Sequence, residues 1–339
     1  MPRTIRRLMR KYGLKRQGSR RAHPPSMFEV RRPHRPNVGL PRDLLCDVRQ
    51  IAAVDQQFRP LLDNPAVRDA IERDSIPVPA PQDREGYFDD RHLSYWLSGY
   101  DDLRVVRGVV PAGAMQRVLD FGGASGRFAR QVILADANAT VTIAELNVNH
   151  VAWVDEHFGR SVRAVKVSPY PHFPLADGSV TLCVGLSVFT HIDSYESGWL
   201  AEIHRVLAAG GYAFLTIHSE HTWPLFAGRP DLQSKLTRDP RFDLLFRADE
   251  PMPAERLVFT YEIESIEQNC DTFFHSDYIR RCWGRWFEIV DIRPQAHHGF
   301  QTVVVLRKSS RDRLMMSPNE LNCASVDATP ESICEASAI

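Results

Sequence analysis

Hydrophobic residues recur along most of the chain with two different periods. Short apolar runs rich in Val, Ile, Leu and Phe predict strands, and apolar residues three or four positions apart predict helices. From residue 117 onward the two kinds of segment alternate. The predicted strands span 117–122, 140–146, 163–167, 179–187 and 211–218, and the predicted helices span 126–136, 149–158 and 195–208. This alternation is typical of a parallel sheet with helices on both faces.

The C-terminal end of the pattern is different. A helix predicted over 276–287 leads to strands over 287–294 and 300–308. Only residues 295–299 separate these strands, and so short a loop joins antiparallel neighbours. We therefore expect an α/β fold over residues 111–309, a Rossmann-like doubly wound sheet that is mostly parallel and ends in an antiparallel hairpin.

Two further segments accompany this sheet. Residues 41–110 are expected to form N-terminal helices, because amphipathic patterns over 42–62, 65–74 and 91–110 are separated by proline and glycine. Residues 224–271 form an insertion that is too long for a plain connection, so we expect a lid over a bound acceptor.

Both ends of the chain are polar and aperiodic. Residues 1–40 and 310–339 are therefore expected to be mostly disordered. Basic residues crowd the first 21 positions, and Ile5, Leu8, Met9 and Tyr12 recur there at helical spacing. This basic arm is either a solvated tail or a short amphipathic helix that associates weakly with an anionic membrane surface.

Composition narrows the class of protein. The chain has 42 Lys and Arg and 42 Asp and Glu, and this balance argues against a nucleic-acid partner. No apolar run of about 18 residues is present, and no apolar segment follows the N-terminal charges as in a secretory signal. The six cysteines form no C-x-x-C pair, which favours reduced thiols over disulfides or a zinc site. We expect a cytoplasmic protein.

A glycine cluster follows the first predicted strand, in the stretch RVLDFGGASGRFAR. Gly122, Gly123 and Gly126 occupy the turn into the next helix, where the backbone can approach a ligand. The spacing does not match the nicotinamide pattern G-x-G-x-x-G. Asp120 precedes the turn and suits a cationic group better than a pyrophosphate, and Glu145 ends the second strand, where an acid can bind a ribose. S-adenosylmethionine combines a ribose with a positive group.

These segments resemble the class I S-adenosylmethionine-dependent methyltransferase family over about residues 95–308. VLDFGGASGR resembles its first motif, with Ala124 where the middle glycine commonly lies, and IAEL resembles its second motif. The segments 173–193, 199–218 and 273–308 resemble its later strands and helices. The resemblance implies S-adenosylmethionine as cofactor. The cofactor-binding residues that we predict are Asp120, Gly122, Gly123, Gly126, Glu145, Ser168 and Ser187.

Methyl transfer to a hydroxyl requires that the hydroxyl lose a proton, and a nearby base assists this step. The loop SVFTHID after the fourth strand offers His191 as the base and Asp193 as the group that orients it. A packing or loop-capping role for His191 is the alternative.

A second polar cluster follows the fifth strand. His218, Glu220 and His221 lie there, and His275 lies in FFHS further along. Histidines and a carboxylate can bind a divalent metal, but this spacing matches no established ligand pattern. We therefore predict substrate contacts for the three histidines, and no metal.

Aromatic side chains of the segment SYWLSGY, Tyr95 and Tyr100, are also expected to contact the acceptor. Mixed aromatic and polar groups suit a small polar molecule or a glycan. Sequences with segments like SVFTH and FFHS resemble methyltransferases that act on glycans or secondary metabolites. We expect O-methylation of a carbohydrate or another small-molecule hydroxyl. N-methylation of an amine and a non-catalytic cofactor-binding module remain alternatives.

Overall fold

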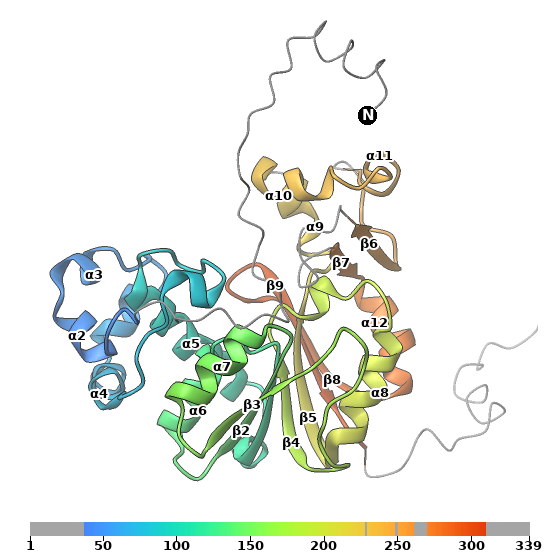
Figure 1. The fold of residues 1–339 in the computed structure, drawn as a ribbon. Coiled ribbons are helices and arrows are strands. Elements are labelled where there is room, and N and C mark those ends of the chain that lie inside the picture. Colours follow the sequence, from blue (N-terminus) through green and yellow to red (C-terminus); the bar gives the residue numbers. More distant parts are fainter. Residues whose placement is uncertain (1–36, 228, 248–249, 261–269, 310–339) are drawn as a thin grey trace, which may run out of the picture.

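A computed structural model describes residues 37–227, 229–247, 250–260 and 270–309 (Figure 1). Its main feature is a seven-stranded sheet with the order β3-β2-β1-β4-β5-β9-β8. The strands are β1 Arg117–Phe121, β2 Thr140–Glu145, β3 Val162–Lys166, β4 Val180–Gly185, β5 Leu207–Ile217, β8 Glu288–His297 and β9 Gln301–Arg307. The strands from β1 to β5 pair in parallel, and β9 runs antiparallel to both of its neighbours. The predicted mostly parallel sheet with its antiparallel end is confirmed.

Helices cover both faces of this sheet (Figure 1). The alternation along β1 shows why, because successive side chains of a strand point to opposite faces. Val118 packs with the helices α5, α6 and α7, and Leu119 packs with α8 and α12. The bounds of these helices are α5 His92–Arg107, α6 Arg127–Ala135, α7 Val148–His157, α8 Glu196–Val206 and α12 Ser276–Cys282. The doubly wound arrangement is therefore confirmed.

The N-terminal segment is helical but more broken than predicted. Residues 42–62 do not form one helix. They contribute to α2 Pro41–Cys46, α3 Val48–Ala52 and the 3-10 turn η1 Arg59–Asp63, which is followed by α4 Pro65–Arg73. Asp47 is extended between α2 and α3, and its side chain accepts the backbone N–H of Arg49 at 2.8 Å. This N-cap starts a new helix and interrupts the longer pattern.

The expected insertion folds as a small unit with its own core. It contains α9 Trp223–Ala227, α10 Pro230–Leu236, α11 Phe242–Leu245 and β6 Arg256–Thr260. Strand β6 pairs antiparallel with β7 Cys270–Phe274. Buried aromatic residues pack between these elements. The unit stands beyond the end of β5 (Figure 1), where His218 forms a bridge with Phe273 of β7.

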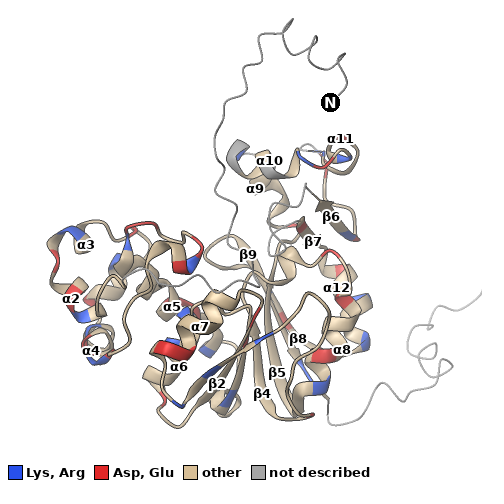
Figure 2. Cartoon of the chain, in the orientation of Figure 1, with Lys and Arg blue, Asp and Glu red and all other residues tan. Residues whose placement is uncertain are grey.

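Four short 3-10 turns complete the described elements. They are η2 Pro81–Arg84, η3 Ala112–Gln116, η4 Phe189–His191 and η5 Trp283–Arg285. Acidic and basic residues are interspersed over the described elements (Figure 2). In the part of the chain that the structure describes, no helix has both the length and the apolar character needed to cross a membrane. The predictions for residues 1–36 and 310–339 lie outside the described residues.

Candidate functional site

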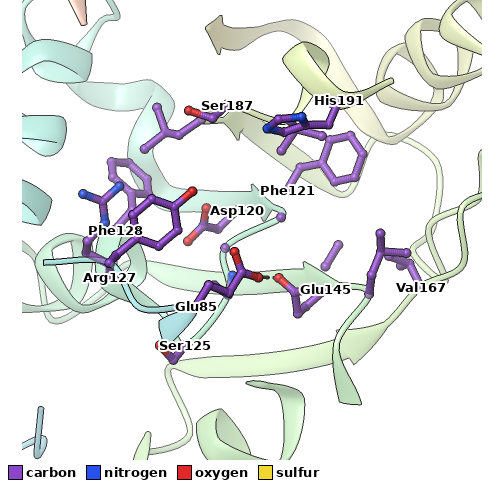
Figure 3. Close-up of a pocket in the computed structure, with 18 of the residues that line it drawn as sticks. Glu85, Asp120, Phe121, Ser125, Arg127, Phe128, Glu145, Val167, Ser187 and His191 are labelled. Carbon is purple, nitrogen blue, oxygen red and sulfur yellow. Dashed lines mark hydrogen bonds between the residues drawn. The ribbon is translucent and has the colours of Figure 1, made fainter. Parts of the chain in front are cut away.

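A cavity of about 370 Å³ lies at the carboxyl ends of the parallel strands (Figure 3). Its wall comes from the turn after β1, the end of β2, the loops after β3 and β4, and two segments far away in the sequence, near residues 84–88 and 297–298. The predicted site residues that line it are Tyr95, Asp120, Gly122, Gly123, Glu145, Ser168, Ser187, His191 and Asp193. The topology therefore brings most of the predicted residues to one cavity.

The turn after β1 requires glycine at three positions. Gly122 and Gly126 have φ angles of +69° and +81°, in the left-handed region that favours glycine. A Cβ atom on Gly123 would lie 2.5 Å from Asp120 Oδ2, closer than any real contact. Gly126 does not line the cavity itself, but it caps the start of α6. The turn thus brings backbone atoms close to whatever the cavity binds.

Asp120 is a buried carboxylate at the centre of the cavity wall (Figure 3), with 2% of its surface exposed. Burial raises its pKa to about 7, and the nearby charges of Glu145 and Asp102 act in the same direction, whereas Arg127 opposes them. Within the described residues its Oδ2 atom has no hydrogen-bond partner. A cationic group in the cavity would supply the missing interaction.

Two backbone groups hold the carboxylate of Glu145. The N–H of Ala124 donates to Oε2 and the N–H of Asn147 donates to Oε1, each at 2.8 Å. Burial raises the pKa of Glu145, and the two backbone N–H groups partly offset this effect. The carboxylate is therefore oriented at the end of β2, and its remaining lone pairs can accept ligand hydroxyls.

The end of η2 and the loop that follows it were not predicted to belong to the site. Arg84, Glu85, Tyr87 and Phe88 of the N-terminal segment line the cavity. Glu85 Oε1 lies 3.9 Å from His150 Nδ1, which in turn lies 4.0 Å from Glu145 Oε1. The loop joins the cavity through tertiary packing, and no pattern in the sequence indicated this.

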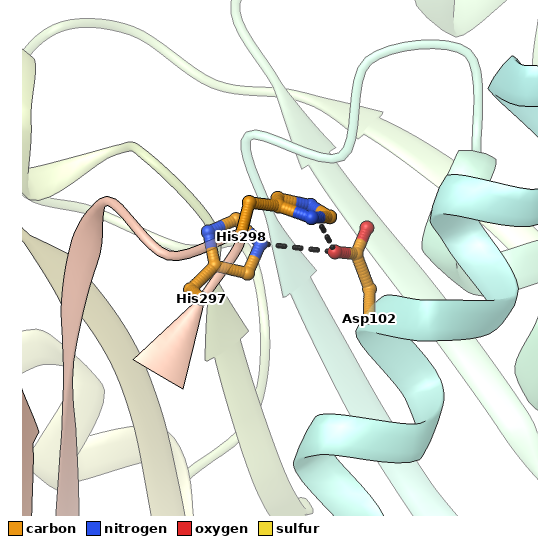
Figure 4. A group of neighbouring side chains, drawn as sticks. All are labelled: Asp102, His297 and His298. Carbon is orange, nitrogen blue, oxygen red and sulfur yellow. Dashed lines mark hydrogen bonds and ion pairs between the residues drawn. The ribbon is translucent and has the colours of Figure 1, made fainter. Parts of the chain in front are cut away.

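A second missed group surrounds Asp102 of α5 (Figure 4). Its Oδ1 atom lies 2.9 Å from His297 Nε2 and 3.0 Å from His298 Nε2, and its Oδ2 atom lies 3.1 Å from Arg127 Nη2. Although burial opposes ionisation, Arg127 and the two histidines hold the pKa of Asp102 well below its usual range. His297 and His298 also line the cavity.

The three ligand atoms of Asp102, His297 and His298 lie within 4.8 Å of one another, so the group could hold a metal ion. Two observations weigh against that interpretation. Arg127 already binds the same carboxylate, and a second cation would be repelled. His297 Nδ1 is buried without a hydrogen-bond partner among the described residues, whereas a metal-bound histidine usually donates its other ring N–H. We interpret the group as a hydrogen-bonded junction between α5, α6 and the β8–β9 turn.

His191 lies at the end of η4 and lines the cavity (Figure 3). Its Nδ1 atom lies 2.8 Å from the carbonyl oxygen of Cys270. Because a carbonyl can only accept, Nδ1 carries the proton, and Nε2 of the neutral ring keeps its lone pair. Asp271 Oδ1 lies 3.8 Å from the same Nδ1 atom. Asp271 was not singled out in the sequence, because it lies 80 positions away in the insertion.

Part of the chain around this cavity matches a known protein family. Residues 119–215 match a family model described as "Methyltransferase domain". This match identifies residues 119–215 as a methyltransferase domain, in agreement with the resemblance to the class I family. A match to this family implies S-adenosylmethionine as the cofactor. No curated protein sequence matches the chain.

Several solved methyltransferase structures are similar to this chain. One from Methanosarcina mazei is 16% identical, covers 61% of this chain and 98% of its own, and has a TM-score of 0.43. One from Thermotoga maritima, titled a possible histamine N-methyltransferase, is 17% identical, covers 66% and 96%, and has a TM-score of 0.42. A third, from Mesorhizobium loti, is 12% identical, covers 61% and 97%, and has a TM-score of 0.42.

The cavity of the methyltransferase domain fits this cofactor. The Oδ2 atom of buried Asp120, which has no hydrogen-bond partner in the described part of the chain, suits one of the positive groups of S-adenosylmethionine. Glu145 presents an oriented carboxylate to a ribose. The glycine turn has no side chains that would obstruct the part of the cofactor between its ribose and its positive group. Ser187 donates its hydroxyl to Gln301 Oε1 at 3.0 Å, which fixes its side chain at the cavity wall.

The two tyrosines predicted to contact the acceptor lie in different places. Tyr95 lines the cavity of the methyltransferase, and its hydroxyl lies 3.3 Å from Ser125 Oγ. Tyr100 does not line it. Its ring is stacked on Trp96, with ring centres 6.2 Å apart, and packs against the core of the N-terminal helices.

The three predicted substrate histidines of the methyltransferase also lie outside the cavity lining. His218 is buried among aromatic rings, including that of Phe273. His221 is exposed, with Nε2 3.6 Å from Glu220 Oε1. His275 caps α12 and accepts the backbone N–H of Asp277. Their contacts with a substrate stay predictions, and the cavity itself gives them no support.

The described residues of the insertion, which we predicted to form a lid over the acceptor, do not line the cavity. Between residues 224 and 260, no described residue lines the cavity, and residues 261–269 lie outside the described residues. The described part of the insertion instead contacts the loop that carries His191. A lid role stays a prediction.

Proposed function

We propose that this methyltransferase transfers the methyl group of S-adenosylmethionine to a hydroxyl of a carbohydrate or another small molecule, with His191 as general base. The observation that supports this proposal is the hydrogen bond from His191 Nδ1 to the carbonyl of Cys270. It leaves Nε2 as a proton acceptor on a residue that lines the cavity. A hydroxyl needs such a base far more than a neutral amine does.

The cofactor would be held by residues of the β1 turn and of β2. Asp120 would bind a positive group of its methionine part, and the backbone at Gly122 and Gly123 would pack against it. Glu145 would accept the ribose hydroxyls. Ser168 and Ser187 would contact the nucleoside from the loops after β3 and β4.

When bound, the cofactor would supply a methyl group on a sulfonium sulfur, and its neutral thioether, S-adenosylhomocysteine, would be the leaving group when the carbon–sulfur bond breaks in the in-line displacement. The protein orients the acceptor hydroxyl and excludes water from the cavity. His191 Nε2 accepts the hydroxyl proton as the new carbon–oxygen bond forms. Nδ1 keeps its proton and continues to donate it in a hydrogen bond to the carbonyl oxygen of Cys270, so the imidazolium is held in place.

The proposal is tested with methyl-labelled S-adenosylmethionine and panels of sugars, phenols and amines, with NMR identification of the methylated atom. We expect label on oxygen. His191→Asn is expected to lower turnover by about 10²- to 10⁴-fold with unchanged cofactor affinity, whereas the exposed histidine variant His172→Asn serves as the control. Label found only on nitrogen would refute O-methylation. Near-normal turnover of His191→Asn would refute its role as the general base.

A further inference from the structure

The loop that carries His191 is held by the inserted unit. Arg256 of β6 donates from Nη2 to the carbonyl oxygens of Ile192 at 2.8 Å and Asp193 at 2.7 Å. Thr272 of β7 donates its hydroxyl to the same carbonyl of Ile192 at 2.9 Å. Together with the bond from His191 to Cys270, four hydrogen bonds join the β6–β7 hairpin to the loop over residues 191–193.

The hairpin itself is anchored to the methyltransferase core. Arg256 Nε lies 3.1 Å from Glu196 Oε2, at the start of α8. Glu196 also accepts hydrogen bonds from Tyr278 Oη and from Trp283 Nε1 at the far end of the chain. Because Glu196, Arg256 and Trp283 are largely or fully buried, water does not compete strongly with these contacts. Arg256 therefore connects the rigid core to the loop.

Asp271 lies between two histidines. Its Oδ1 atom is 3.8 Å from His191 Nδ1 and 3.7 Å from His218 Nε2, and the residue is 5% exposed. A carboxylate at this distance stabilises a positive charge on the His191 ring. The sequence suggested Asp193 for this role. Its backbone carbonyl accepts a hydrogen bond from Arg256, and the residue lines the cavity.

We propose that the β6–β7 hairpin is the element that positions His191, with Asp271 as the positioning carboxylate and Arg256 as the clamp on its loop. The insertion then serves the reaction as a scaffold for the base. This inference rests on the proposed function of His191, but the contacts that carry it do not depend on which acceptor is methylated.

The first test follows the His191 ring by nitrogen NMR in the full chain bound to S-adenosylhomocysteine. Charged and titratable groups near this ring in the described residues are Asp271 and Cys270 from β7, Arg256 from β6, His218 after β5 and Asp193 on its own loop. Asp271→Asn is expected to lower the midpoint of imidazolium formation by about one pH unit, because it removes the adjacent negative charge. Asp193→Asn is expected to lower this midpoint less. Asp271→Glu keeps the negative charge, so its midpoint should lie close to that of the wild type.

The second test measures amide hydrogen exchange of the loop over residues 189–194. Arg256→Gln is expected to speed exchange there at least tenfold, while the remaining sheet stays protected. Arg281→Gln is the matched control, because Arg281 forms an exposed ion pair with Glu255 near the same hairpin.

An unchanged His191 midpoint in Asp271→Asn would overturn the role of Asp271 as the positioning carboxylate. Loop exchange in Arg256→Gln equal to that of the control would overturn the role of Arg256 as the clamp. Neither readout requires turnover. If His191→Asn kept its activity while both readouts changed as expected, the proposed base would be wrong and the positioning contacts would stand. Once an acceptor is known, Asp271→Asn should lower kcat and leave KM and cofactor affinity nearly unchanged.

Discussion

The backbone N–H of Ala124 donates to Oε2 of Glu145 at 2.8 Å. This bond links the glycine turn after β1 to the end of β2 across 21 positions of sequence. Since the other oxygen of Glu145 accepts the N–H of Asn147, the carboxylate is fixed by two elements before any ligand arrives. The ligand-binding end of the sheet is therefore preorganised, and this lowers the entropy cost of binding.

Glu145→Gln should weaken cofactor binding by about 1–3 kcal/mol. An amide cannot accept from both backbone N–H groups and a ribose at once, because one of its two polar atoms is a donor. Calorimetric titration with S-adenosylhomocysteine measures the loss. Glu72→Gln, an exposed position on α4, is the control and should bind normally. Equal affinity of Glu145→Gln and the control would exclude a ribose contact.

The affinity for the cofactor should depend on pH through Asp120. Its pKa is about 7 because burial disfavours the charged form. A cationic ligand group favours the ionised carboxylate, so the affinity should rise as the pH increases to about 7 and level off above it. Below that value each pH unit should cost up to about tenfold in affinity.

Calorimetry in buffers of different ionisation enthalpy should show that binding near pH 6 releases a proton from Asp120. In Asp120→Asn, both the proton release and the pH dependence should disappear, and binding should be weak throughout. Asp155→Asn, an exposed position on α7, is the matched control. A constant wild-type affinity between about pH 6 and pH 8 would contradict this role of Asp120.

Much of the fold was predictable because its signals are local. Val118 and Leu119 are both apolar because β1 is covered on both faces, and the five-residue loop between the last two predicted strands allows only an antiparallel pair. The glycine turn and Asp120 were also visible because they are adjacent in the sequence, and Glu145 was visible because it ends the next predicted strand.

The parts that could not be predicted depend on contacts between distant residues. Asp102 meets His297 across 195 positions, and Asp271 meets His191 across 80. Each of these residues looks ordinary in its own segment. The burial of His218 among aromatic rings was likewise not visible in the sequence, because it depends on tertiary packing, and the substrate contact of His218 stays a prediction.

Gly123→Ala should abolish cofactor binding without unfolding the sheet. The new Cβ atom would lie 2.5 Å from Asp120 Oδ2, so the carboxylate or the turn must move. Either movement displaces the group that we expect to bind the cofactor. Gly113→Ala is the control, because a Cβ atom there meets nothing within 4 Å. A Gly123→Ala variant with normal affinity would show that the turn tolerates a side chain and that Asp120 is not closely packed against the ligand.

Two adjacent aspartates on α5 give a matched test of stability. Asp102 is buried against Arg127 and the two histidines, whereas Asp101 pairs with the exposed Arg104. Asp102→Ala leaves a largely buried guanidinium without its carboxylate, and it should lower the free energy of unfolding by about 3–5 kcal/mol near pH 7. Asp101→Ala should lower it by less than about 1 kcal/mol.

The pH dependence of this difference follows from the depressed pKa of Asp102. A carboxylate whose pKa is lower in the folded state stabilises the fold above its unfolded pKa, and this contribution is lost as the pH falls. The gap between wild type and Asp102→Ala should therefore be widest near neutral pH and narrow below about pH 4. Urea unfolding of both variants at several pH values measures it. A gap that stayed constant with pH would mean that lost packing, and not lost charge, destabilises Asp102→Ala.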